Sequence, residues 1–117
     1  MNARVVTSLV LLILCGCHTP PTGAPTDLGD GFRREGHPAF TPKEQAVVVA
    51  TREAIEKSCR RRIDAYYRVR HTWEAYSVLV FEVYRYVRRK PTFTIGRDWG
   101  VDLKEDGTVT RVDHLNM

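Results

Sequence analysis

The chain has 117 residues, and its 18 Lys and Arg side chains against 14 Asp and Glu give a modest formal net charge of +4. Its 3 cysteines are too few for a fold held together by several disulfides. The sequence contains no glycine-rich phosphate loop, no nucleophile elbow and no Glu-x-x-His motif, so it excludes the assignment of an activity by motif.

The N-terminus is predicted to be a signal peptide over residues 1–16. Arg4 precedes residues 5–14, which are apolar apart from Thr7 and Ser8. A helix of this length covers roughly 15 to 20 Å, whereas the hydrocarbon core of a bilayer is about 30 Å thick. The apolar stretch is therefore too short to span a membrane.

The sequence Leu14, Cys15, Gly16, Cys17 resembles the lipobox of bacterial lipoproteins. In that family the lipidated cysteine follows a small residue, and an aliphatic residue lies three positions before it, so the resemblance selects Cys17 over Cys15. It implies a covalent lipid on Cys17 and a domain held at the bacterial cell envelope. Since no cofactor motif is present elsewhere in the sequence, we expect no other cofactor. The residue after the cysteine is His18 and not Asp, which by the same resemblance favours the outer membrane.

Removal of residues 1–16 leaves Cys59 as the single thiol besides Cys17, so no internal disulfide is expected. Cys59 falls on the apolar stripe of a predicted helix, where a free cysteine packs as a small hydrophobic residue. Pairing with another molecule is the alternative.

Residues 17–40 are predicted to be the lipidated cysteine and a disordered, partly extended tether. Prolines and glycines are frequent there, and no apolar periodicity is present. Phe32 and Phe40 are its large apolar side chains, and Phe40 is expected to dock at the start of the following helix.

A helix is predicted from residue 42 to about residue 61. Thr41 at the N-cap, Pro42 at the first position and Glu44 at the third form a capping box, with Phe40 as half of a hydrophobic staple. One stripe of the helix is apolar and is expected to face a sheet, and its members are Val47, Val48, Thr51, Ala54, Ile55, Ser58 and Cys59.

The pattern then changes to the two-residue period of strands. Strands are predicted over residues 63–71, 76–86, 98–104 and 108–114. Asp106 and Gly107 predict a tight hairpin between the last two strands. Residues 88–97 contain Pro91 and Gly96, and they fit a loop or a ragged strand edge equally well.

The predicted fold class is α+β, with one N-terminal amphipathic helix packed on a three- or four-stranded antiparallel meander in a domain over residues 41–117. A domain of this size without disulfides has a small core. Its stability is expected to depend on large aromatic side chains or on a partner that covers the other sheet face. Those side chains are Tyr67, Trp73, Phe81 and Trp99. The sequence leaves open whether Trp73 and Tyr76 belong to the core or to a partner surface.

The helix, the run over residues 67–83 and the hairpin over residues 99–112 are similar to the small PepSY-type and cystatin-like domains of exported bacterial proteins. They are also similar to immunity proteins with the nuclear-transport-factor fold. The shared element is an aromatic or apolar strand, an Asp-Gly turn and a Val-x-x-Val return strand, and no functional residue is carried over from these resemblances.

Two basic clusters are the candidate binding features of the domain. Residues 60–62 end the predicted helix, where cations suit its dipole, and Arg88, Arg89 and Lys90 lie in the predicted loop. For an exported protein, lipid head groups, lipopolysaccharide phosphates or an acidic protein are better partners than nucleic acid. Ordinary solvated arginines are the alternative.

Other polar residues give no metal or catalytic pattern by spacing. The four histidines are far apart in sequence, and Asp98, Asp102 and Glu105 are expected on a solvated face. We therefore expect a non-enzymatic, tethered module that binds an envelope protein. The alternatives are an immunity or inhibitor protein against an exported toxin or protease, and a small hydrolase or redox enzyme that uses Cys59 or His71.

Overall fold

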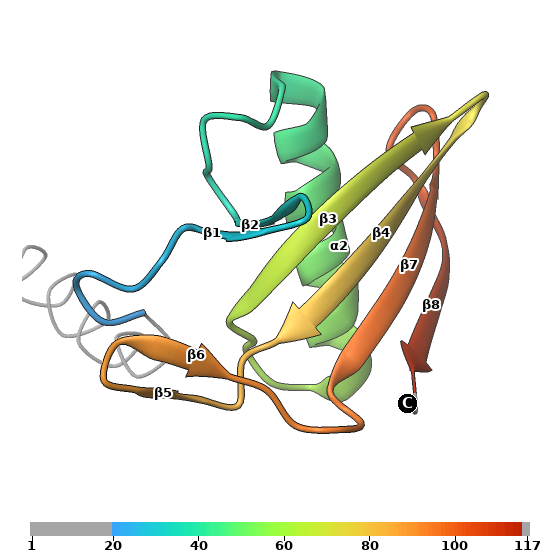
Figure 1. Cartoon of the computed structure of the whole chain (residues 1–117). Coiled ribbons are helices and arrows are strands. Elements are labelled where there is room, and N and C mark those ends of the chain that lie inside the picture. Colours follow the sequence, from blue (N-terminus) through green and yellow to red (C-terminus); the bar gives the residue numbers. More distant parts are fainter. Residues whose placement is uncertain (1–19, 116–117) are drawn as a thin grey trace, which may run out of the picture.

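The computed structural model describes residues 20–115, which form one helix and eight strands (Figure 1). No helix within this range has the length and apolar character needed to cross a bilayer. The elements are β1 (Asp27–Gly29), β2 (Phe32–Arg34), α2 (Pro42–Cys59), β3 (Ala65–Thr72), β4 (Ala75–Glu82), β5 (Arg85–Val87), β6 (Lys90–Thr92), β7 (Asp98–Lys104) and β8 (Val109–Leu115).

Six strands form one antiparallel sheet in the order β1-β2-β3-β4-β7-β8, and α2 packs across one face of it. The β5–β6 hairpin is a separate two-stranded sheet, inserted between β4 and β7 (Figure 1). The predicted α+β class is thus confirmed. The prediction of three or four strands was too low, and α2 is not the first element of the fold, because two short strands precede it.

The helix begins as the sequence predicts. The backbone N–H of Glu44 donates to Thr41 Oγ1 at 3.1 Å, and the Glu44 carboxylate accepts from the Thr41 N–H at 2.9 Å. Phe40 is buried in the core beside this cap. The helix ends at Cys59, two residues earlier than predicted, because Arg60 adopts the left-handed conformation with a φ of 58°.

Part of the segment predicted as a disordered tether is ordered. Strands β1 and β2 form a hairpin in which β2 pairs with the edge of β3. Phe32 is buried, and its ring stacks on Phe81 with the centroids 4.2 Å apart. The tether prediction is therefore wrong for residues 27–34, because the apolar partner of Phe32 lies far away in the sequence and leaves no local periodicity.

The long strands lie close to their predicted positions. The second predicted strand is shorter than expected, since β4 ends at Glu82 and the N–H of Tyr84 instead donates to Thr92 at the base of the β5–β6 hairpin. The ambiguous stretch over residues 88–97 contributes β6 and the loop that leads to β7. The last hairpin turns at Asp106 and Gly107, as predicted, with Gly107 at a φ of 90°.

Buried side chains form two clusters, one on each side of the sheet. The helix-side cluster contains Tyr67, Tyr76 and Trp99, and the opposite cluster contains Phe32, Tyr66 and Val83. Tyr76 is thus a core residue. Trp73, counted among the residues that could support the core, is instead 98% exposed in the turn between β3 and β4.

Thr51 is the weak point of the helix-side core. It is fully buried between α2 and the sheet, and its hydroxyl has no hydrogen-bond partner among the described residues. Burial of a hydroxyl without a partner costs free energy. We predict that Thr51→Val, which keeps the shape, raises the free energy of unfolding by about 1 kcal/mol, whereas Thr51→Ala lowers it through a cavity. Urea denaturation of both variants measures this, and a Thr51→Val protein less stable than the wild type would contradict it.

Candidate functional site

The sheet face opposite the helix is only partly covered. Strand register places its side chains in three rows across β3, β4 and β7. The row nearest the C-terminal end of β4 is largely aromatic, and the next two rows are more polar. These rows are Tyr66, Phe81 and Asp98; Arg68, Leu79 and Gly100; and Arg70, Ser77 and Asp102.

The loop between β6 and β7 folds onto the aromatic row and leaves a pocket there. Phe93 lies with its ring centroid 6.2 Å from Tyr66 and 6.0 Å from Phe81. The pocket has a volume of about 280 Å³. We call it the Phe81 pocket, and its lining residues are Phe81, Phe93, Thr94, Ile95 and Asp98.

The Phe81 pocket combines apolar walls with one carboxylate. Ile95 is 86% exposed and Phe93 is 40% exposed, so the rim presents apolar surface to solvent. Burial raises the pKa of Asp98, and the nearby His114 partly opposes this effect. At about 280 Å³ the Phe81 pocket lies at the lower end of the range of about 300 to 1,000 Å³ that is typical of small-molecule sites, and it can hold a small group such as a single side chain of a partner.

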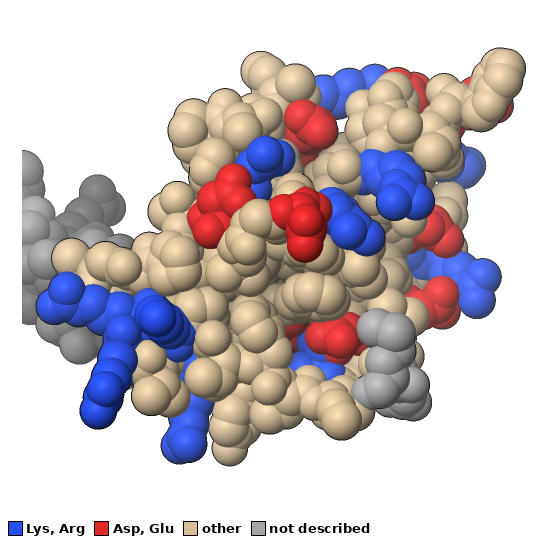
Figure 2. All heavy atoms as spheres, in the orientation of Figure 1, with Lys and Arg blue, Asp and Glu red and all other residues tan. Residues whose placement is uncertain are grey.

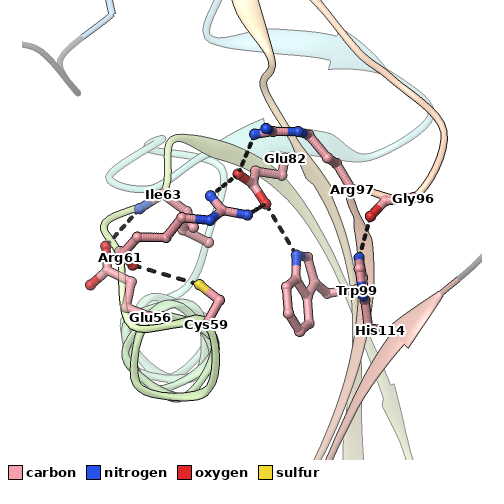
Figure 3. A network of polar contacts seen from close by, with 9 residues as sticks. All are labelled: Glu56, Cys59, Arg61, Ile63, Glu82, Gly96, Arg97, Trp99 and His114. Carbon is pink, nitrogen blue, oxygen red and sulfur yellow. Dashed lines mark hydrogen bonds and ion pairs between the residues drawn. The ribbon is translucent and has the colours of Figure 1, made fainter.

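A buried carboxylate holds both ends of the segment that forms this pocket. Glu82 is 2% exposed at the end of β4, and Figure 3 shows three side chains converging on it. It accepts two hydrogen bonds from Arg61, one of them at 2.9 Å, one from Arg97 at 3.1 Å, and one from the Trp99 indole at 3.3 Å.

The backbone joins this Glu82 network to the loop. The Glu82 N–H donates to the carbonyl of Arg97 at 3.2 Å, so the chain leaves β4 and returns to β7 at the same point. Arg61 lies just after α2, and its contact with the carboxylate raises the pKa of its guanidinium. The Glu82 network therefore links the helix end, β4 and the start of β7, and its role is structural.

A second polar network holds the β5–β6 hairpin against the other edge of the sheet. Asp64 pairs with Arg34 at 2.6 Å and accepts a hydrogen bond from the Tyr86 hydroxyl at 2.5 Å. Burial is the largest cause of the raised pKa of Tyr86, and the hydrogen bond to Asp64 raises it further. The Tyr66 hydroxyl donates to the carbonyl of Pro25 at 2.6 Å, which fixes the incoming chain nearby.

The predicted basic cluster of Arg88, Arg89 and Lys90 lies at the β5–β6 turn, and all three residues are exposed. Arg88 and Arg89 both adopt positive φ values, 52° and 67°. All three residues of the cluster at 60–62 are exposed, but Arg61 also binds Glu82. Cys17 lies outside the described residues.

The structure does not bring the two residues of the enzyme hypothesis together. Cys59 packs partly in the core, and its thiol lies 3.7 Å from the carbonyl of Arg61. His71 lies near the other end of β3, where its ring stacks on Tyr76 and its Nε2 lies 2.5 Å from Glu105.

The predicted acidic trio is also dispersed. Asp98 lines the pocket and Asp102 is exposed on the sheet. Glu105 pairs with Lys43 at 2.6 Å, and the bonds from Lys43 and then His71 lower its pKa. Within residues 20–115 there is no group of three His, Cys, Asp or Glu side chains that could hold a metal ion.

Two important features were missed in the sequence. Glu82 was detectable, because it is the single acidic residue in the largely apolar strand predicted over residues 76–86. The pocket residues Phe93 and Ile95 carried no such signal, since they lie in an irregular loop.

No family model, no curated protein and no solved structure matches this chain. Its function is therefore inferred from the contacts and exposed surfaces described above.

The Glu82 network generates a stability prediction. Glu82→Gln is expected to lower the free energy of unfolding by about 1 to 3 kcal/mol, because the negative charge is lost and one of the two acceptor oxygens becomes an amide NH2, which cannot accept from Arg61, Arg97 or Trp99. The double change Arg61→Ala and Arg97→Ala is expected to cost about 3 to 5 kcal/mol, because it leaves a buried carboxylate without a counter-charge. Urea denaturation measures both, with Arg62→Ala as the exposed control. A double variant no less stable than this control would contradict the role given to the network.

Proposed function

We propose that this chain is a lipid-anchored protein of the bacterial envelope, with a non-enzymatic domain that binds another envelope protein through the Phe81 pocket. The observation that supports the binding role best is the pocket itself, an apolar hollow with an exposed rim on the partly covered face of the sheet. Exposed apolar surface of this kind is typical of sites of protein interaction.

The anchor is proposed from the lipobox-like sequence that ends at Cys17. Cys17 lies only three residues before Pro20, the first described residue. The Pro20–Pro25 region is then held by the bond between Pro25 and Tyr66. A lipid on Cys17 would keep the domain close to the bilayer, with the outer membrane favoured by His18 and the domain facing the periplasm or the cell surface.

The binding partner is proposed to be a protein that inserts one apolar side chain. A residue of this kind, placed between Phe93 and Ile95, would bury both rim side chains and displace water from the walls. Well-packed central pockets of this type contribute much of the affinity of small interfaces. The Asp98 carboxylate at the base offers one polar contact that fixes orientation.

A non-enzymatic role is proposed because Glu82 and Asp64, the best-buried carboxylates outside the pocket, already serve the fold. Glu82 is occupied by Arg61 and Arg97, and Asp64 by Arg34 and Tyr86. Nucleophilic catalysis requires a nucleophile and a base within hydrogen-bond reach of each other, whereas Cys59 is the last residue of α2 and His71 lies near the far end of β3.

Photo-crosslinking in intact envelopes tests this proposal. A photoreactive residue in place of Ile95 is expected to trap one discrete protein, because Ile95 forms the exposed rim of the pocket. The same residue in place of Trp73, which is more exposed but lies at the far end of β4, is the matched control and is expected to trap none.

Mass spectrometry of the same membrane fraction tests the anchor separately. The wild-type chain is expected to start at an acylated Cys17, and Cys17→Ala is expected to remain unprocessed and unacylated. An unmodified wild-type N-terminus would contradict the lipoprotein proposal. Equal crosslinking from residues 73 and 95 would contradict the binding surface.

A further inference from the structure

Residues 84–97, which join β4 to β7, concentrate positive charge and exposed apolar side chains. This segment contains Arg85, Arg88, Arg89, Lys90 and Arg97 and no acidic residue. Large apolar side chains that are exposed also gather there, and they are Tyr84, Val87, Phe93 and Ile95. Basic and apolar residues combined in one exposed segment are typical of surfaces that bind the interface of an anionic membrane.

The most basic part of this segment is the turn of the β5–β6 hairpin, which projects from the sheet (Figure 1). Figure 2 shows Lys and Arg side chains gathered on the side where Figure 1 places this hairpin, with no acidic side chain beside them on this face. None of the ion pairs found within residues 20–115 includes Arg88, Arg89 or Lys90. These cations are therefore available to an external anion.

The turn has an unfavourable sequence for its backbone conformation. A two-residue hairpin turn with two positive φ values is normally formed by Asn-Gly or a similar pair. Arg88 and Arg89 occupy these positions here, with φ values of 52° and 67°. Arginine is strained in this backbone conformation, and a turn with a purely structural role would not require it. Backbone strain of this kind is often found at functional positions.

The chain enters the domain beside this turn. A Cβ atom built on Gly23 would lie 3.3 Å from the Cδ atom of Arg89, so the incoming segment contacts the basic hairpin directly. Cys17 precedes Gly23 by six residues, which reach at most about 20 Å when fully extended. A bilayer that held a lipid on Cys17 would lie within reach of the hairpin.

We propose that the β5–β6 turn is a membrane-contact site in which Arg88, Arg89 and Lys90 bind the phosphates of anionic phospholipid head groups. Arginine suits this ligand, because its planar guanidinium donates two hydrogen bonds to one phosphate. Val87, which is 47% exposed beside the turn, contacts the interface between head groups and acyl chains. An acidic protein could pair with the same cations, but the position of these cations next to the lipid anchor would not strengthen its binding. It would strengthen binding to a bilayer.

This inference rests on the proposed lipid anchor and extends it. Lipidation alone would leave the domain free to rotate, whereas a second contact at the hairpin would orient it. Trp73, at the tip of β3 and β4, would then lie away from the bilayer, because it is at the opposite end of the sheet (Figure 1).

The test measures contact between the hairpin and a bilayer of known composition. The full chain isolated from membranes, with Cys59→Ala, receives a spin label at Val87→Cys or, as the control position, at Trp73→Cys. It is reconstituted into vesicles of phosphatidylcholine alone or with phosphatidylglycerol. We expect the label at residue 87 to enter the interface only when phosphatidylglycerol is present, to be released by salt, and the label at residue 73 to stay in water.

A pair of charge-removing variants separates lipid binding from folding. The double variant Arg88→Asn with Arg89→Gly removes two cations and gives the turn its preferred residues. Its fold is therefore expected to be at least as stable as that of the wild type. The ratio of docked to undocked label is expected to fall by at least about tenfold. Arg60→Gly is the matched control, because it also removes an exposed cation at a positive φ, of 58°, but lies at the end of α2. It is expected to leave docking unchanged.

Several results would overturn the membrane site. These are equal docking on vesicles without phosphatidylglycerol, unchanged docking by the Arg88 and Arg89 variant, and crosslinking of residue 87 to an acidic protein in intact envelopes in place of lipid. A separate measurement, the mass of the N-terminal peptide, shows whether the lipid anchor is present. If Cys17 carries no lipid, flotation of the same chain with each type of vesicle still decides whether the hairpin binds anionic lipid.

Discussion

The fold depends on the way Glu82 is held at the end of β4. A buried carboxylate is costly unless it is paired and hydrogen-bonded, and here Arg61, Arg97 and Trp99 all donate to it. These donors come from the end of α2 and from the start of β7. One acidic side chain thus fixes the helix relative to the sheet, and it also closes the segment that leaves β4 and returns at β7.

The two faces of the sheet serve different purposes because of this arrangement. The helix-side face holds most of the core, including Tyr67 and Leu103. The opposite face is covered in part by Phe32 of the N-terminal hairpin and in part by the closed segment, which folds back onto the aromatic row and forms the Phe81 pocket. The same segment extends outward as the basic β5–β6 hairpin. A protein-binding pocket and a lipid-binding turn would therefore be held in a constant relation by one insertion in the sheet.

The sequence predicted the elements whose signals are local, and it missed those that depend on distant contacts. Thr41, Pro42 and Glu44 specify the helix start within four residues, and alternation marks β3 and β7 directly. The β1–β2 hairpin escaped prediction because Phe32 packs on Phe81, which lies far along the chain. The helix ends early because Arg60 adopts a positive φ, and Trp73 also has a positive φ in its turn; such angles are uncommon for non-glycine residues, so no composition rule indicates them. The basic cluster was recognisable in the sequence, and its role stays a prediction, whereas the Phe81 pocket was not recognisable, because Phe93 and Ile95 lie in an irregular loop.

Amide hydrogen exchange in the wild-type protein and in Arg97→Ala tests most directly whether the Glu82 network positions this segment. The change removes one donor to Glu82 but leaves the β5–β6 ladder and the Asp64 network intact. We predict that exchange accelerates selectively over residues 83–97, including the Tyr84 amide that bonds to Thr92, while the amides of α2 keep their rates. Unchanged exchange over residues 83–97, or a uniform acceleration across the whole domain, would contradict the central role of Glu82.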